Sequence, residues 1–229
     1  MKIGIITAMA KEITPLYEKL GVETQRISRS GVEIGRFTVG DHDVYLAQSG
    51  VGEISAAMTV QMLYDVYGVE VILNFGFVGS LDARFEVGDL VLVEKVVHYQ
   101  FDTSAIDPVP VGMYFNRDDL YFHLDRGLIE RLQAQLEKPL PLVVDASGDK
   151  FIATSADREY LRTFGAHICE MECAGLALAC ERIGLPFLSV KVISDKADEA
   201  AEVTFAEVFR RGLTNYERIL PHVLAAVGR

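Results

Sequence analysis

Three acidic residues lie beside apolar segments: two follow predicted buried strands, and the third lies in a stretch whose flanks predict burial. Glu12 follows the apolar run KIGIIT, Glu172 lies in the stretch HICEMECAGLALAC at 167–180, and Asp195 follows the run PFLSVKVIS. In open α/β sheets, ligands bind beyond the carboxyl ends of the strands. Carboxyl groups gathered at such an edge can serve as a general acid and a general base. The pattern therefore predicts a ligand site with acid–base chemistry.

Glycine-rich turns follow two other predicted strands, in SGVGEIS at 49–55 and NFGFVGSL at 74–81. Glycine adopts positive φ and has no Cβ, so such turns let the backbone approach a ligand closely. A further turn, SGDKFIATS, carries Phe151 and Ile152. These two are core residues in the simplest interpretation, and an aromatic ring beside a glycine turn can also stack on a flat ligand.

Each carboxyl also has a simpler interpretation. Glu12 suits the first turn of a helix, where the helix dipole favours an acid, and spacing alone favours that interpretation. Asp195 is either a turn residue or a buried carboxyl whose pKa is raised by desolvation, which would let it donate a proton. Glu170 and Glu172 would share one face of an extended segment, and they would diverge if a helix starts at Glu172.

The three cysteines, Cys169, Cys173 and Cys180, all fall in the same stretch. Their spacing matches no common zinc pattern, and an odd number does not suit a disulfide framework. We interpret them as small buried hydrophobic residues. The five histidines are scattered, so the sequence predicts neither a metal nor a cofactor.

Composition narrows the class of protein. The chain has 229 residues, 50% of them hydrophobic, and a formal net charge of −11. We expect a single domain spanning residues 1–229. No cluster of Lys and Arg indicates a nucleic-acid partner, and no apolar run has the length of a membrane span. The N-terminus is expected to form a first strand and not a signal peptide, so we expect a cytoplasmic protein.

Continuous β-branched runs alternate with helical patterns, which predicts an α/β layer architecture. A hairpin is expected over 22–48. The predicted strands are KIGIIT, VYLAQSG, VEVILNFG, GDLVLVEKVV and PFLSVKVIS, and the predicted helices are 11–20, 54–67, 120–137, 157–163, 173–183 and 205–227.

Taken in order, the motifs TAMAKE, SGVG, NFGFVGSL, VGDLV, SGDKFI, EMECAG and VKVISDKAD resemble the 5′-methylthioadenosine/S-adenosylhomocysteine nucleosidases. These enzymes belong to the purine nucleoside phosphorylase/hydrolase superfamily, and the resemblance covers nearly the whole chain. It implies a three-layer α/β/α fold with a central mixed twisted sheet. It also implies a small-molecule nucleoside substrate, a homodimer and a place in methionine salvage.

The resemblance also implies roles for individual residues. Asp195, supported by Ser194, would protonate the purine at N7. Glu172 would bind the ribose hydroxyls, and Glu12 would activate the attacking water. The remaining implied contacts are Met171 on the ribose, Phe151 and Ile152 at the purine, Met9, Val51 and Phe205 around the ribose and 5′-substituent, and Gly79 in the turn after the third strand.

The charges of the reaction suit these residue types. Cleavage of the N-ribosidic bond puts negative charge on the purine and positive charge on the sugar, so an acid at N7 and a carboxylate at the hydroxyls both lower the barrier. Phosphorolysis would need cationic donors for phosphate. The superfamily's phosphorylases have arginines where this chain reads TAMAKE and NFGFVGSL, which favours water as the nucleophile.

Two residues depart from the family pattern. Phe77 stands where these nucleosidases usually have a small or polar residue, so it joins the candidate substrate-binding set, and Lys191 stands where an arginine is common. The segment HYQFDTSAIDPVPVGMYF also differs from familiar members. Three alternatives stay open: a nucleosidase for futalosine-type or other nucleosides, a phosphate-dependent phosphorylase, and a nucleoside-binding protein without catalysis.

Overall fold

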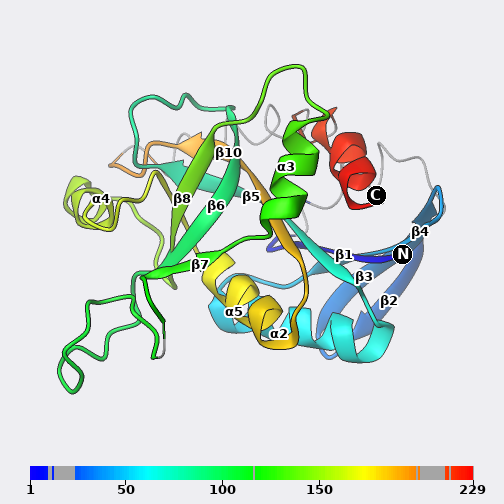
Figure 1. The fold of residues 1–229 in the computed structure, drawn as a ribbon, viewed down its shortest axis with the longest axis horizontal. Helices are drawn as coiled ribbons and strands as arrows, with labels where there is room; N and C mark the ends of the chain where they lie inside the picture. Colours follow the sequence, from blue (N-terminus) through cyan, green and yellow to red (C-terminus); the bar gives the residue numbers. More distant parts are fainter. Residues whose placement is uncertain are drawn as a thin grey trace.

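The computed structural model describes residues 1–9, 12, 24–115, 117–199, 201, 215, 216 and 218–228. Within these residues a mixed ten-stranded sheet carries helices on both faces (Figure 1), which confirms the predicted α/β fold. The strands are β1 (Lys2–Thr7), β2 (Gln25–Arg29), β3 (Val32–Val39), β4 (His42–Gln48), β5 (Val71–Ser80), β6 (Leu90–His98), β7 (Tyr121–His123), β8 (Leu142–Ser147), β9 (Ile168–Glu170) and β10 (Phe187–Asp195).

All described helices except α4 form two groups (Figure 1). Helix α2 (Glu53–Met62), which continues as the π-helical turn η1 (Leu63–Tyr67), packs against α5 (Cys173–Ile183). Helix α3 (Arg126–Gln133) lies near the C-terminal helical segment 218–227, where Arg131 donates a hydrogen bond to the carbonyl oxygen of Ala226 at 2.9 Å. Helix α4 (Ser155–Arg162) stands apart from both pairs.

Five strands of the sheet close on one another. Strand β5 pairs with β10 and β9, β6 pairs with β10 and β8, and β8 pairs with β9. The first half of β5, on the edge that pairs with β9 further along, also pairs with β1, and from there the sheet continues through β4 and β3 to β2. Strands β5 and β10 are buried along their whole length, as expected for parallel strands covered on both faces.

The sequence predicted five of these strands, β1, β4, β5, β6 and β10. The helix predicted over 120–137 is wrong at its start, because Tyr121–His123 forms β7 against β6 and the helix begins only at Arg126. The hairpin predicted over 22–48 is a three-stranded meander in its described part. The predicted helix 11–20 lies outside the described residues except for Glu12. The predicted helix 205–227 is helical at 215, 216 and 218–227, and its other residues lie outside the described part of the chain.

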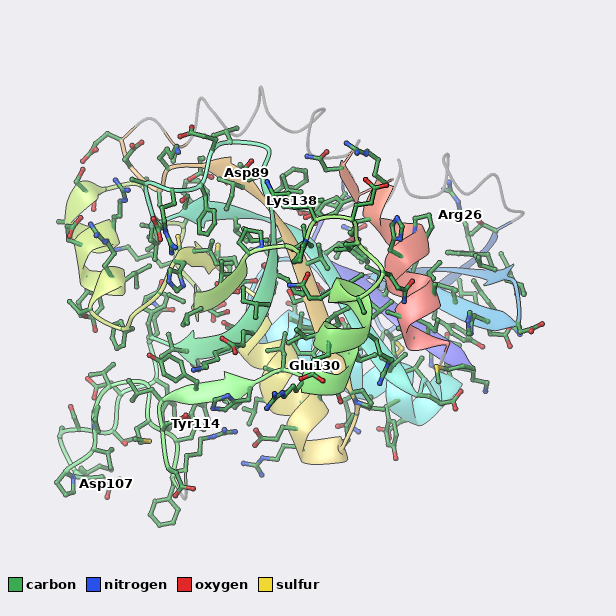
Figure 2. The ribbon with its side chains drawn as sticks, turned by 45° about the horizontal axis from the view of Figure 1, so that its top comes forward. Arg26, Asp89, Asp107, Tyr114, Glu130 and Lys138 are labelled. Carbon is green, nitrogen blue, oxygen red and sulfur yellow. The ribbon has the colours of Figure 1, made fainter. Side chains whose placement is uncertain are left out.

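The segment 99–115 projects from the body of the molecule, with Asp107 far from the sheet and Tyr114 nearer to it (Figure 2). None of the helices in the described part of the chain combines the length and apolar character that a bilayer crossing requires.

The start of α3 at Arg126 has a local cause that can be tested. The side chain of Asp125 accepts a hydrogen bond from the backbone N–H of Leu128 at 2.7 Å and so caps the helix. We expect Asp125→Ala to lower the free energy of unfolding by about 1 kcal/mol, measured by urea denaturation. Arg126→Ala is the control, because that side chain is 90% exposed; equal stabilities of the two variants would contradict the capping role.

Candidate active site

One cavity of about 230 Å³ lies at the carboxyl ends of β1, β5, β9 and β10. Every candidate site residue from the sequence lines it except Phe205, which lies outside the described residues. The structure thus brings these residues together, although it does not test their roles. Those that line the cavity are Met9, Glu12, Val51, Phe77, Gly79, Phe151, Ile152, Met171, Glu172, Ser194 and Asp195.

Asp195 is placed by the irregular end of β10. The register with β5 shifts between Ile193 and Asp195, which sets Asp195 opposite Gly79. Its Oδ1 accepts a hydrogen bond from the backbone of Ala197 at 2.8 Å, and Ser194 Oγ lies 2.7 Å from Oδ2. A Cβ on Gly79 would come within 3.1 Å of Oδ1, so glycine leaves room for the carboxyl. Burial raises the pKa of Asp195, which suits a proton donor.

Glu12 lies at the end of the cavity beside β1. It is 2% exposed, and its Oε2 accepts a hydrogen bond from the backbone N–H of Met9 at 2.8 Å. Burial raises the pKa of Glu12, while backbone donors and the nearby Lys191 oppose that effect. A buried carboxyl with a raised pKa can accept a proton near neutral pH, so the arrangement suits a general base.

Glu172 and Glu170 separate at the junction of β9 and α5. The strand ends at Glu170 and the helix begins at Cys173, so Glu172 occupies the N-cap position and the two side chains diverge. Oε1 of Glu172 accepts a hydrogen bond from the N–H of Gly52 at 2.9 Å. Burial and the neighbouring Glu170 raise the pKa of Glu172 to about 8.

Glu170 instead forms a buried ion pair. Its Oε2 lies 3.0 Å from Nζ of Lys191, and the side chains are 3% and 2% exposed. The same carboxylate accepts hydrogen bonds from the backbone of Glu172 at 3.1 Å and of Cys173 at 2.9 Å. Negative neighbours, above all Glu170, outweigh desolvation and raise the pKa of Lys191, so its ammonium stays charged.

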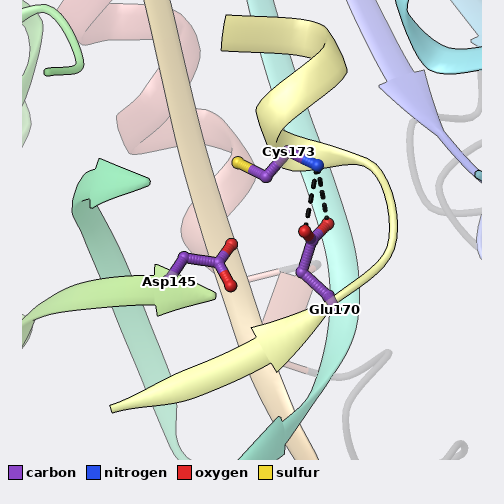
Figure 3. Close-up of side chains that lie close together, drawn as sticks. All are labelled: Asp145, Glu170 and Cys173. Carbon is purple, nitrogen blue, oxygen red and sulfur yellow. Dashed lines mark hydrogen bonds between the residues drawn. The ribbon is translucent and has the colours of Figure 1, made fainter. Parts of the chain in front are cut away.

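A second buried acid, Asp145, lies behind this pair. Asp145, Glu170 and Cys173 each place one possible ligand atom within 4.8 Å of the others (Figure 3). Neither oxygen of Asp145 has a hydrogen-bond partner among the described residues, and burial raises its pKa. The ammonium of Lys191 already supplies positive charge to this cluster. Both oxygens of Glu170 already accept hydrogen bonds, so the arrangement disfavours a metal ion.

Aromatic and apolar side chains form the rest of the wall, and the buried Tyr216 packs behind Phe77. The hydroxyl of Tyr216 accepts a hydrogen bond from the N–H of Gly76 at 2.9 Å and donates one to the carbonyl oxygen of the same residue. Its ring meets Phe77 edge-on with centroids 5.7 Å apart. Phe151 and Val51 are 48% and 52% exposed, which places them at the mouth of the cavity.

Sequence reasoning missed several polar groups around the cavity. Asp145, Glu53 and Lys150 were not singled out, and Lys191 appeared only as a departure from a family pattern. Asp145 lies in β8, a strand absent from the prediction, so no pattern marked it as buried. Glu53 directly follows the turn SGVG, and its place after a predicted strand was a usable signal.

The chain matches a family model described as the phosphorylase superfamily over residues 2–225. It is 31% identical over 212 residues to an aminodeoxyfutalosine nucleosidase of Campylobacter jejuni, covering 90% of this chain and 91% of the relative. It is 30% identical over 234 residues to a 5′-methylthioadenosine/S-adenosylhomocysteine nucleosidase of Staphylococcus carnosus, covering 98% of this chain and 100% of the relative.

Solved structures agree with these relatives. A Helicobacter pylori 5′-methylthioadenosine/S-adenosyl homocysteine nucleosidase with a bound pyrrolidine compound superposes with a TM-score of 0.92 at 28% identity, covering 98% of each chain. A futalosine hydrolase of the same species also superposes with a TM-score of 0.92 at 28% identity, covering 98% of this chain and 97% of the other.

The buried ion pair yields a stability prediction. Lys191→Met would leave Glu170 buried without its counterion, so we expect a loss of about 3 to 5 kcal/mol in the free energy of unfolding, measured with urea. Adding Glu170→Gln removes the uncompensated charge and should recover most of that loss. A double variant no more stable than Lys191→Met alone would contradict this account of the pair.

Proposed function

The chain belongs to the phosphorylase superfamily, and we propose that it is a purine nucleosidase that hydrolyses 5′-methylthioadenosine and S-adenosylhomocysteine to release adenine. The observation that carries this proposal is the gathering of Glu12, Glu172 and Asp195 around one cavity. The three carboxyl groups have different hydrogen-bond partners, which suits three different roles. The named relatives and the inhibitor-bound neighbour support the same reaction class.

In the proposed mechanism, Asp195 donates a proton to the purine at N7 as the N-ribosidic bond breaks. Glu172, held by Gly52, binds the ribose hydroxyls and, in its ionised form, stabilises the positive charge that develops on the sugar. Glu12 takes a proton from a water that attacks the opposite face of the ring, as in inverting glycoside hydrolysis. The scheme requires no metal or cofactor.

Water is favoured over phosphate because the cations at the cavity are already engaged. Among the described lining residues, the cationic side chains are Lys150 and Lys191. Lys150 pairs with Asp157 at 2.7 Å, and Lys191 pairs with Glu170. Phosphate binding in such a site would need free cationic donors, and the buried acid Glu12 adds repulsion.

A second candidate substrate is an aminodeoxyfutalosine- or futalosine-type nucleoside. The relatives from Campylobacter jejuni and Helicobacter pylori are named for those activities. Phe77 in the cavity wall and the projecting segment 99–115 are two of the places where this chain departs from the family pattern. The reaction is the same for both candidates, so they differ only in the group attached at the 5′ position.

We also propose a homodimer, located in the cytoplasm and acting in methionine salvage. Ile54 and Met58 of α2 are 73% and 64% exposed and lie one turn apart, and Val51 continues this apolar face into the cavity. An exposed apolar face that reaches an active site suits a self-association surface. A second copy docked there would cover the mouth of the cavity.

The reaction class is tested by a substrate panel with and without phosphate. We expect adenine release from 5′-methylthioadenosine and S-adenosylhomocysteine at a rate independent of phosphate, followed by absorbance. No release from any nucleoside by a folded protein would exclude the nucleosidase. Strict phosphate dependence would indicate a phosphorylase, and faster turnover of a futalosine-type nucleoside would favour the second candidate.

The roles of two carboxyls are tested by isosteric amides. We expect Asp195→Asn and Glu12→Gln each to lower kcat at least a hundredfold, because each removes a proton-transfer step. Glu33→Gln, an exposed change on β3, serves as the control. Near-normal kcat in either variant would refute the assigned role, and adenine binding without turnover in the wild type would indicate a binding protein.

The proposed dimer is tested by light scattering after size exclusion. The double variant Ile54→Lys, Met58→Lys should convert a dimeric wild type into a monomer, because two charges would be buried at the interface. A monomeric wild type, or a variant that stays dimeric, would overturn the assignment of this face. The matched control is Tyr160→Lys, which replaces an exposed apolar side chain on α4, away from this face.

A further inference from the structure

Helices α2 and α5 begin side by side at the cavity. The start of each helix donates a hydrogen bond to a glutamate at the start of the other. The N–H of Gly52, the N-cap residue of α2, donates to Oε1 of Glu172, the N-cap residue of α5, at 2.9 Å. In return, the N–H of Gly175, in the first turn of α5, donates to Oε2 of Glu53, the first residue of α2. Each helix start therefore binds an acid carried by the other.

The four N–H groups at the start of α5 are all satisfied by buried side chains. The first turn of a helix leaves such donors without backbone partners. Glu170 accepts from Glu172 and Cys173, Ser147 accepts from Ala174 at 3.0 Å, and Glu53 accepts from Gly175. Because other side chains meet these donors, the carboxylate of Glu172 is free to face the cavity.

Glu53, the first residue of α2, contacts the start of α5 as well. It is 6% exposed, does not line the cavity, and also accepts a hydrogen bond from the hydroxyl of Ser147. The packing is tight, because a Cβ on Gly175 would lie 2.2 Å from the carbonyl oxygen of Glu53. Asp149 accepts the N–H of Glu53 at 2.8 Å, which fixes the start of α2 from the other side.

A protonated, uncharged Glu53 can keep its contacts to both helix starts. Burial, together with the nearby charge of Glu170, raises the pKa of Glu53 to about 8. The ionised carboxylate accepts from the hydroxyl of Ser147 and from the N–H of Gly175. When Glu53 is protonated, the oxygen that faces Ser147 carries the proton and can donate to Ser147 Oγ instead, while the other oxygen still accepts from Gly175. Glutamine has the same shape and the same pair of acceptor and donor, so it can replace the protonated acid.

We propose that Glu53 is a positioning residue, which sets Glu172 against the substrate through the reciprocal contacts between the starts of α2 and α5. This inference rests on the proposed function, because Glu172 is the group that acts on the substrate. Loss of Glu53 would free both helix starts to shift, and Gly52 would then no longer hold the carboxylate of Glu172. Displacement of a positioned group by about 1 Å can cost about a hundredfold in rate.

A double-mutant cycle tests the proposal. Glu53→Ala and Glu53→Gln are made in the wild type and in Glu172→Gln, and kcat and KM for adenine release are measured. We expect Glu53→Ala to lower kcat about 10- to 100-fold, with KM changed less than about threefold, and Glu53→Gln to stay within about threefold of wild type. In the Glu172→Gln background, Glu53→Ala should cost less than about threefold.

Controls separate positioning from general loss of structure. Glu181→Ala removes an exposed side chain from the far end of the same helix α5 and should leave kcat unchanged. Equal losses from Glu53→Ala in both backgrounds would overturn the proposal, as would a Glu53→Ala variant with normal kcat. If Glu53→Ala does not fold, Ser147→Ala, which removes the hydroxyl shared by Glu53 and Ala174, is taken through the same cycle with the same criteria.

The outcome can be told apart from failure of the proposed function. A wild type without turnover on any nucleoside refutes the nucleosidase but leaves the cycle measurable as calorimetric affinity for 5′-methylthioadenosine. Glu53→Ala should then weaken binding about tenfold in the wild-type background and less than about threefold in Glu172→Gln. The absence of this coupling would refute the positioning role by itself.

Discussion

A buried ammonium surrounded by acids is the interaction on which the cavity depends. Lys191 is 1% exposed, and isolated charges at such depth are costly unless paired and hydrogen-bonded. Its pairing with Glu170 meets that requirement, and Glu170 in turn holds the first N–H groups of α5. The end of β9, the middle of β10 and the start of α5 are thereby joined at one point.

Burial also acts on the pKa values of the remaining acids, and the charge of Glu170 acts on some of them. Burial, with the nearby negative charge of Glu170 adding to its effect, raises the pKa of Glu172 and of Glu53 to about 8. Asp195 stands further along β10, where burial raises its pKa and two hydrogen bonds oppose the rise. Closure of β5, β10, β6, β8 and β9 on one another brings these acids together from distant parts of the chain.

Much of the fold could be predicted from the sequence, because strands covered on both faces leave continuous apolar runs. Strands β8 and β9 escaped because Asp145 and Glu170 interrupt their apolar character, and β9 has only three residues. The same fact explains what was missed in the site. Glu53, Asp145 and Lys191 are buried polar groups whose burial follows from tertiary pairing, which periodicity cannot show. The motifs predicted Glu12, Glu172 and Asp195 for one site, and the family resemblance separated Glu172 from Glu170. Spacing alone left the direction of the two side chains open, which the observed start of α5 decides.

The central claim is that this site uses water to cleave an N-ribosidic bond. Its most direct test is turnover of 5′-methylthioadenosine in ¹⁸O-labelled water containing phosphate, with mass spectrometry of the sugar product. The account predicts one ¹⁸O atom at the anomeric carbon of the free sugar and no sugar phosphate. An unlabelled sugar 1-phosphate would contradict it.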